Sequence, residues 1–436
     1  MSSPVTEETK AQLTPEDQER LEREARGFGV LRFRNYRLFF SGQLISTTGM
    51  WMQSLAQSWL VVETLNASAF QLGLVPIFQF GPSLFLGIPA GTLIDRWSKK
   101  HILIVTQFMY MAIALTLGIL TVTGNIQLWH VYATAFTFGM TGALDMPSRQ
   151  AFVSELVPRY ALKNAIAINA ATFNTGRILG PAIAGVVLAT FGVAACFFMN
   201  AAGYLGPLIA LLRMELVPFI KKSAGSGWSQ MKEGLGYVRR TPDIMRPIML
   251  VMVVGSFGMA YNVWLPLLAT ESFNADETVF GVMFSSMGFG SLLGALSIAY
   301  MKGGPSRKRM LIAAIALGVV TVSIGVIASV PMAVWLASIT LAISGFCASN
   351  TMSMANTIVQ TTAPDELRGR VMSVYTTVFM GTMPISGLIA GIIADRWSIE
   401  ASMYFGGGIV AIVATIMFVR QRTAGEVTKR APIPIG

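Results

Sequence analysis

The chain alternates between long apolar stretches and shorter polar segments along almost its whole length. Each apolar stretch holds about 20 residues, which is the length that an α-helix needs to cross the hydrocarbon core of a bilayer. The stretches fall at 38–62, 70–92, 102–123, 129–149, 164–191, 194–214, 247–269, 279–300, 310–330, 332–356, 371–394 and 402–419. This pattern predicts an all-α membrane protein with twelve transmembrane helices.

Basic residues lie on alternate sides of these predicted spans. Nearly all of the 32 Lys and Arg residues precede the first span, follow an even-numbered span or follow the last one. Basic loops stay on the cytoplasmic side of a membrane, so we expect both the N and the C terminus to be cytoplasmic. The net charge of +10 is therefore a topology signal and does not indicate a nucleic-acid partner.

Composition agrees with a membrane protein and argues against several classes of function. Hydrophobic residues make up 53% of the chain and charged residues 12%, about half the charged share of soluble domains. Cys196 and Cys347 are far apart and the two His residues give no ligand set, so no metal and no cofactor is expected. No phosphate-binding loop and no soluble catalytic domain can be recognised, which argues against an ATP-driven pump or an enzyme.

The chain divides into two similar halves. We predict a polar cytoplasmic N-terminal segment (1–30), an N-terminal six-helix half (31–214), a cytoplasmic linker with an amphipathic helix (215–243), a C-terminal six-helix half (244–420) and a cytoplasmic tail (421–436). The halves align at an offset of 206, at which 31–38 falls on 237–244 and 158–165 falls on 364–371. Repeats of this kind are common in transporters, which hold their substrate between the halves near the membrane midplane.

The loop after the second span combines a glycine, an acid and several bases. It reads GTLIDRWSKK over 91–100, and its candidate latch residues are Gly91, Asp95, Arg96, Lys99 and Lys100. Gly91 would let two helices approach closely, and Asp95 could cap a neighbouring helix or pair with an Arg. A contact of this kind can hold one conformation of a transporter and open in the other. A near copy at 391–398 follows the eleventh span, on the opposite side of the membrane.

The fifth span carries a motif of small residues, which reads GRILGPAIAG over 176–185. Gly176, Gly180 and Ala184 recur every four residues and predict a smooth face for a partner helix. Pro181 can kink the span, and Gly185 completes the motif.

Arg177 is a charge deep inside the same span. A charged residue at this depth costs ~2.5 kcal/mol or more on insertion and usually faces a polar cavity. We expect Arg177, with Asn174 one turn away, to face a central cavity and to pair with Asp145 or with an anionic group of the substrate. The alternatives are a purely structural Arg177 and an Asp145 that pairs with Arg149, four residues further on.

Polar and polarisable side chains occur on the helices expected to line that cavity. The polar candidates for substrate or proton contact are Trp51, Gln53 and Gln57 in the first span, Glu63 at its outer end, and Tyr261 and Asn262 in the seventh span. Aromatic and Met residues nearby favour a bulky, partly apolar substrate as a set, although packing is the simpler explanation for each one alone; they include Trp264, Met283, Phe284 and Met287.

The loop at 91–100 closely resembles the signature of the major facilitator superfamily, and the motif at 176–185 resembles the Gly-Pro motif of its antiporters. The strings FRNYRLF (33–39), GLGYVRRTP (234–242) and PDELRGR (364–370) resemble the drug-antiporter branch that includes macrolide efflux and enterobactin exporter proteins. This resemblance implies alternating access by rocking of two halves, driven by proton influx, in a multi-pass protein of the plasma (inner) membrane. One departure concerns coupling, because Ala135 and Phe138 replace the Arg and Gln of the Arg-x-x-Gln-Gly motif that many drug/proton antiporters carry.

Together these features predict a secondary active transporter that exports a bulky, partly apolar compound, such as a drug or a siderophore-like metabolite, in exchange for protons. Its partners would be the small-molecule substrate, protons and membrane lipid, and we expect a monomer. Two alternatives stay open, which are a flippase for lipid or lysophospholipid on the same fold and a non-transporting sensor.

Overall fold

The computed structural model describes residues 27–215, 227–299, 306–330, 333–364 and 366–430, and all of their regular structure is helical. The predicted N-terminal segment up to residue 26, the linker at 216–226 and the tail from 431 lie outside these residues. The first half comprises η1 (Gly27–Arg32), α3 (Arg34–Trp59), η2 (Leu60–Thr64), α4 (Ala69–Arg96), α5 (Lys99–Val122), α6 (Leu128–Leu156), α7 (Arg159–Phe191), α8 (Val193–Gly203) and α9 (Leu205–Arg213).

The second half begins after the helix that the amphipathic pattern predicts. That helix is α10 (Gly227–Arg240), and its last turn carries two Arg residues. It is followed by α11 (Pro242–Phe257), α12 (Tyr261–Leu267), η3 (Leu268–Ser272), α13 (Glu277–Ala299), α14 (Arg307–Ala328), α15 (Val334–Thr362), α16 (Arg368–Arg396) and α17 (Ile399–Arg430).

Nine stretches of the described residues are long and apolar enough to cross a membrane, and they start at residues 69, 99, 193, 242, 277, 307, 334, 368 and 399. The other three predicted spans correspond to α3, α6 and α7, which are 26, 29 and 33 residues long but more polar. Polar groups in a span raise the cost of insertion, so they are retained where they have partners or a function. These three helices therefore direct the search for a functional site.

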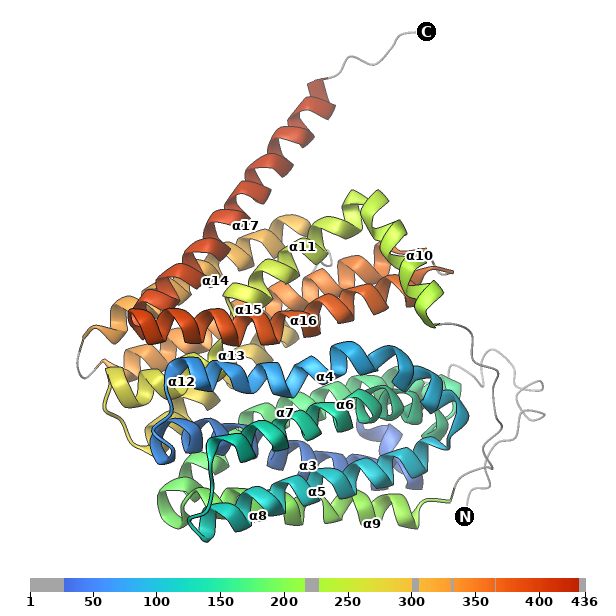
Figure 1. Ribbon diagram of the computed structural model, residues 1–436. Helices are drawn as coiled ribbons and strands as arrows, with labels where there is room; N and C mark the ends of the chain where they lie inside the picture. Colours follow the sequence, from blue (N-terminus) through green and yellow to red (C-terminus); the bar gives the residue numbers. More distant parts are fainter. Residues whose placement is uncertain (1–26, 216–226, 300–305, 331–332, 365, 431–436) are drawn as a thin grey trace, which may run out of the picture.

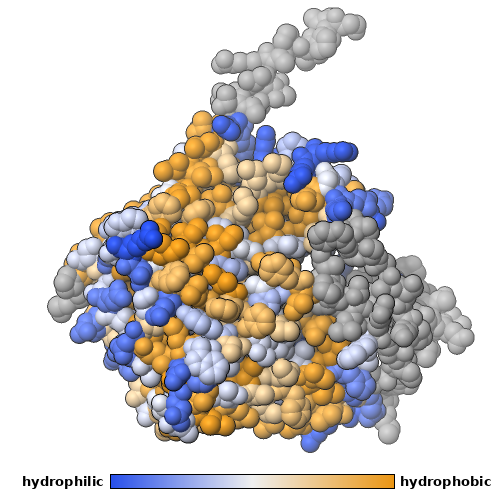
Figure 2. Space-filling model, in the orientation of Figure 1, coloured by the Kyte–Doolittle hydropathy of each residue, from blue (hydrophilic) through white to orange (hydrophobic). Residues whose placement is uncertain are grey.

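Among the described residues, two helix pairs make the most extensive contacts between the halves. α4 packs along α16, and α7 packs along α13. In Figure 1 the first half, in blue and green, lies below α11 and α14–α17, and the end of α17 projects away from the bundle. Figure 2, in the same orientation, shows apolar residues over the middle of the visible surface and hydrophilic residues toward the two ends of the helices, as a bilayer requires.

The two ends of the bundle can be told apart by the contacts between neighbouring elements. At one end, which we call the basic end, ion pairs connect neighbouring elements: Arg34–Glu215, Lys99–Glu155, Asp243–Arg307 and Glu233–Arg370. The opposite end, which we call the far end, holds the turns that follow α3 and α12.

These two far-end turns repeat each other in backbone and in sequence. Each begins with five residues of π-helix, LVVET at 60–64 and LATES at 268–272. Asn66 and Asn274 follow with φ of 47° and 45°, a left-handed conformation in which Asn is tolerated better than most residues. Ser68 and Asp276 then accept a hydrogen bond from a backbone N–H three residues on, at 3.3 and 2.9 Å. The two turns therefore share one backbone conformation and one capping arrangement.

Close helix contacts are repeated in the same way. A Cβ atom at Gly139 of α6 would overlap the Gln79 carbonyl oxygen of α4, and one at Gly345 of α15 would overlap the Met287 carbonyl oxygen of α13. These paired positions lie 206 and 208 residues apart in the sequence. Glycine is required here because the backbones touch, which is how helices pack closely in membranes.

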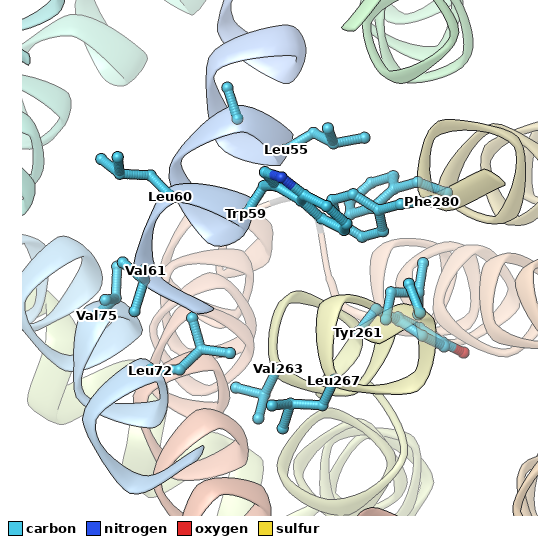
Figure 3. Packing of buried hydrophobic residues seen from close by; sticks show 14 of the residues in the cluster. Leu55, Trp59, Leu60, Val61, Leu72, Val75, Tyr261, Val263, Leu267 and Phe280 are labelled. Atoms are coloured by element: carbon cyan, nitrogen blue, oxygen red, sulfur yellow. The ribbon is translucent and has the colours of Figure 1, made fainter. Parts of the chain in front are cut away.

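One apolar cluster spans both halves at the far end. Trp59 of α3 stacks on Phe280 of α13 with ring centroids 5.2 Å apart, and Leu55 and Tyr261 belong to the same cluster (Figure 3). At the basic end each half has its own apolar cluster, one built on α10, α11 and α14–α17 and the other on η1, α3, α5–α7 and α9.

The aromatic and Met residues of α12 and α13 belong to the far-end cluster. Trp264, Met283, Phe284 and Met287 are at most 2% exposed. Packing therefore accounts for these four residues in this conformation, and the substrate preference inferred from the whole set stays a prediction.

Candidate functional site

Asp145 and Arg149 form a buried ion pair on α6. An Nη atom of Arg149 lies 2.9 Å from Asp145 Oδ1, and Arg149 Nε donates to Oδ2 at 2.9 Å. Asp145 is 7% exposed, and two residues of α5 also donate to its Oδ1: Thr106 Oγ1 at 2.7 Å and Gln107 Nε2 at 3.1 Å. Gln43 of α3 accepts a hydrogen bond from Arg149, so the pair links three helices.

This arrangement decides between the alternatives for Asp145. Four donor contacts end on the Asp145 carboxylate, two from α5 and two from Arg149. Asp145 pairs with Arg149, at the i+4 position of the same helix, and no ion pair between Asp145 and Arg177 occurs among the described residues. The expected Asp145–Arg177 pair is thus not formed in this conformation, because α6 directs Asp145 toward α5 and away from α7.

Arg177 has a different environment. Its guanidinium carbon lies 5.6 Å from the centre of the Trp51 ring of α3, and Phe173 meets the same ring edge-on at 5.7 Å. Both Arg177 Nε and Trp51 Nε1 are buried without a hydrogen-bond partner among the described residues. Arg177 also lies close enough to Tyr261 of α12 for an electrostatic interaction, so it stands where the halves meet.

Tyr261 is held by a contact inside the second half. Its hydroxyl lies 2.8 Å from Ser344 Oγ of α15, and its side chain is 5% exposed. Trp51, Arg177 and Tyr261 are therefore three predicted site residues that the structure brings together. Asn262 follows Tyr261 on the same helix and is partly buried.

The other polar candidates do not join this group. Gln53 accepts a hydrogen bond from Asn200 of α8 at 2.6 Å, inside the first half. Asn174 donates to the Ala170 carbonyl of its own helix at 2.9 Å. Glu63 is exposed in the far-end turn, and Gln57 is partly buried near the end of α3.

The latch loop is described in part. Lys99 pairs with Glu155 at the end of α6, and Lys100 Nζ donates to the Met214 carbonyl at 2.9 Å. Both contacts tie the start of α5 to neighbours in the first half. The side chains of Gly91, Asp95 and Arg96 lie outside the part of the chain that the structure describes.

The glycine motif of α7 packs on two different helices. Gly176 and Gly180 touch the α3 backbone beside Thr47 and Trp51, whereas Gly185 meets Gly281 of α13. Pro181 is buried between these contacts. The motif thus holds α7 against its own half and against the other half, with Arg177 between the contact positions.

A groove of about 550 Å³ lies where α7 meets α13 and α15. Its walls include Val186, Phe289 and Trp335, which are 58%, 52% and 66% exposed, as expected for side chains that face lipid. Ser285 also lines it, and its Oγ is buried without a partner among the described residues. The sequence pattern did not predict this groove, because it forms between distant helices.

The comparisons with known proteins agree on family and fold. A family model described as transmembrane secretion effector matches residues 25–433. The multidrug efflux pump Tap of Mycolicibacterium fortuitum is 27% identical over 84% of this chain and 90% of its own length. The enterobactin exporter of Salmonella typhimurium is 23% identical, over 88% of this chain and 92% of its own.

Solved structures share the fold at low identity. A bacterial homologue of the human lysosomal transporter Spinster, in an inward-facing and unoccupied conformation, superposes with a TM-score of 0.70. The two chains are 13% identical, and the match covers 89% of this chain and 97% of that one.

Proposed function

We propose that this chain, which belongs to the transmembrane secretion effector family of the major facilitator superfamily, exports a bulky and partly apolar compound in exchange for protons. The family assignment makes the chain a multi-pass secondary transporter of the plasma (inner) membrane, and not an enzyme. The efflux pumps among its relatives support the export direction. The division into moving halves at 31–214 and 244–420, with twelve spans, is part of the proposal.

The conformation fits the uptake of substrate from the cytoplasm. The positive-inside rule assigns the basic end to the cytoplasm. The halves share an apolar cluster at the far end and have separate clusters at the basic end. We infer from this distribution that the conformation is inward-facing, with the halves in contact at the far end and apart at the basic end.

The buried Asp145–Arg149 pair is the observation that carries proton coupling. Among the described residues Asp145 is the only Asp or Glu whose side chain is buried. In this conformation Thr106, Gln107 and Arg149 all donate to its carboxylate, and we infer that a proton would compete with these donors for the same oxygens. Separation of Asp145 from these donors in the outward-facing state would let it take up a proton from outside.

The test is proton movement into proteoliposomes that contain a pH-sensitive dye. Lipophilic cations, aromatic carboxylates and macrolides are added one at a time, and we expect a proton flux with some compounds only. Asp145→Asn cannot cycle a proton and should lose this flux, whereas Asp395→Asn, an exposed acid at the far end, should keep it. Flux that survives in Asp145→Asn contradicts coupling through Asp145.

The lateral groove favours a second candidate, the translocation of a lipid or lysophospholipid. Its walls are largely apolar and lipid-facing, and it reaches from the far end toward the middle of α13. Ala182→Trp would fill the groove, whereas Ile312→Trp on lipid-facing α14 would not. Loss of fluorescent lysophospholipid translocation in the first variant alone would support this activity.

A further inference from the structure

The strongest unexplained feature of the interface between the halves is the charge of Arg177. The guanidinium makes no ion pair with any described carboxylate, and its Nε is buried without a partner. By contrast Arg149, which also lies within a predicted span, has three acceptor contacts. A cation held in a membrane span without an anion is expensive, and such residues mark ligand pathways.

Arg177 is too far from the membrane surface for a purely interfacial role. It lies 14 residues before the end of α7 and 18 residues after its start, so the nearer end is about 21 Å away. An Arg side chain cannot extend over that distance to reach head groups or water at either end. Trp51 holds the guanidinium in place by a cation–π contact at 5.6 Å.

The surrounding groups indicate the chemistry of the ligand. Arg177 Nε and Trp51 Nε1 are both N–H donors, and both are buried without an acceptor among the described residues. Aromatic surface from Trp51 and Phe173 lies directly beside these donors. A site with spare donors, a positive charge and aromatic walls fits an anion attached to an apolar body.

The position of Arg177 connects this ligand to the conformational cycle. The Arg177 carbonyl lies against Gly288 of α13, in the second half. An anion bound to Arg177 would therefore touch the first half and lie next to the second. Its binding would change as the halves separate or close.

We propose that Arg177 and Trp51 bind the anionic group of the exported compound, so that the substrate class is an organic anion, such as a carboxylate, with an aromatic or apolar body. This proposal rests on the export function and gives its substrate a charge. The ion pair of Asp145 with Arg149 leaves Arg177 available for substrate, so that the proton site and the anion site are separate.

The experiment measures binding to the purified full chain with three probes that share one apolar body: pyrenebutyrate, pyrenebutanol and pyrenebutylamine. Binding is followed by energy transfer from Trp to pyrene. Pyrenebutyrate should bind about tenfold or more tightly than the other two, which is the discrimination expected of a charge-assisted hydrogen bond in a buried site. Equal affinity for the amine or the alcohol, or no binding of any probe, overturns the proposal.

Variants of Arg177 assign the effect to this side chain. Arg177→Met should lower pyrenebutyrate affinity about tenfold or more and leave pyrenebutanol unchanged, and Arg177→Lys should retain part of the preference. Arg396→Met, at an exposed Arg of the far end, is the matched control and should bind all three probes as the unchanged protein does. If Arg177→Met does not fold, Arg177→Lys still tests whether the preference for pyrenebutyrate depends on this side chain.

Failure of this proposal can be distinguished from failure of the export function. Arg177-dependent binding of pyrenebutyrate without any proton flux across the compound panel would keep the anion site and reject coupled export. Proton flux with cations or neutral compounds, unaffected by Arg177→Met, would keep export and reject the anion site.

Discussion

The two halves of the molecule share backbone turns and close glycine contacts, but they do not share the charged residues inside their helices. Both have a π-helical turn with a left-handed Asn at the far end, and both have a glycine in contact with a carbonyl oxygen of a neighbouring helix. The repeated contacts set the register between the halves. By that register the first-half residues Asp145, Arg149 and Arg177 correspond to Thr351, Ala355 and Met383.

This difference separates two kinds of constraint. The close helix contacts and the far-end turns shape the backbone, and both are present twice. Under the proposed exchange, charged side chains are needed only once, because one proton site and one anion site are sufficient. The second half then contributes an apolar surface and hydroxyl groups such as those of Tyr261 and Ser344.

The largest expected effect comes from removing one partner of the first-half ion pair. Arg149→Ala leaves Asp145 buried without its cation and should lower the free energy of unfolding by about 3–5 kcal/mol. The double variant Asp145→Thr, Arg149→Ala installs the second-half residues at both positions and should recover most of this loss. Unfolding of the purified proteins by SDS in mixed micelles measures both values.

A double variant as unstable as Arg149→Ala would contradict this explanation, because the cost would then not come from an uncompensated charge. Its proton flux provides a second readout. We expect the double variant to fold and yet to lose flux, since a Thr and an Ala cannot carry a proton.

A smaller and symmetric effect is expected at the glycine contacts. Gly139→Ala and Gly345→Ala each force a methyl group against a carbonyl oxygen and should lower the free energy of unfolding by about 1–3 kcal/mol. Gly408→Ala, at a helical glycine with open space around it, is the control and should be neutral or slightly stabilising. If the free energy of unfolding fell in Gly139→Ala but not in Gly345→Ala, the close helix contact would matter in the first half only.

The sequence predicts the helices of this fold better than it predicts which face of each helix points toward which neighbour. Apolar length located the spans, and the amphipathic pattern at 228–240 located α10. The site depends on the orientation of each helix about its own axis, which decides the side chains that meet. Gln43, Thr106 and Gln107 bind the Asp145–Arg149 pair, and the sequence offered only their polarity within apolar runs as a signal.

The same limit explains the expected pairing of Asp145 with Arg177. Both residues are charges within spans, and position along the chain made them the nearest opposite charges in depth. The structure turns Asp145 toward Thr106 and Gln107 of α5, and Arg177 instead lies against the ring of Trp51. A helical wheel cannot show this difference without knowledge of the neighbouring helices.

The far-end repeat was missed for another reason. The strings LVVETLNAS at 60–68 and LATESFNAD at 268–276 are 208 residues apart, whereas the loops at 158–165 and 364–371 are 206 apart. A single fixed offset therefore aligns one pair and shifts the other by two residues. The shift places Asn66 against Ser272 and hides the matching left-handed positions.

The smallest expected effect tests these two turns. Asn66→Ala and Asn274→Ala each place a β-carbon in a left-handed conformation and should lower the free energy of unfolding by about 1 kcal/mol. Asn66→Gly and Asn274→Gly remove that strain and should change it by less than about 0.5 kcal/mol. Equal losses in both halves would show that the turns only shape the backbone. A loss of transport in Asn66→Ala alone, with matched stability, would instead mean that the turn beside Trp59 contributes to closure of the far end in a way that its copy does not.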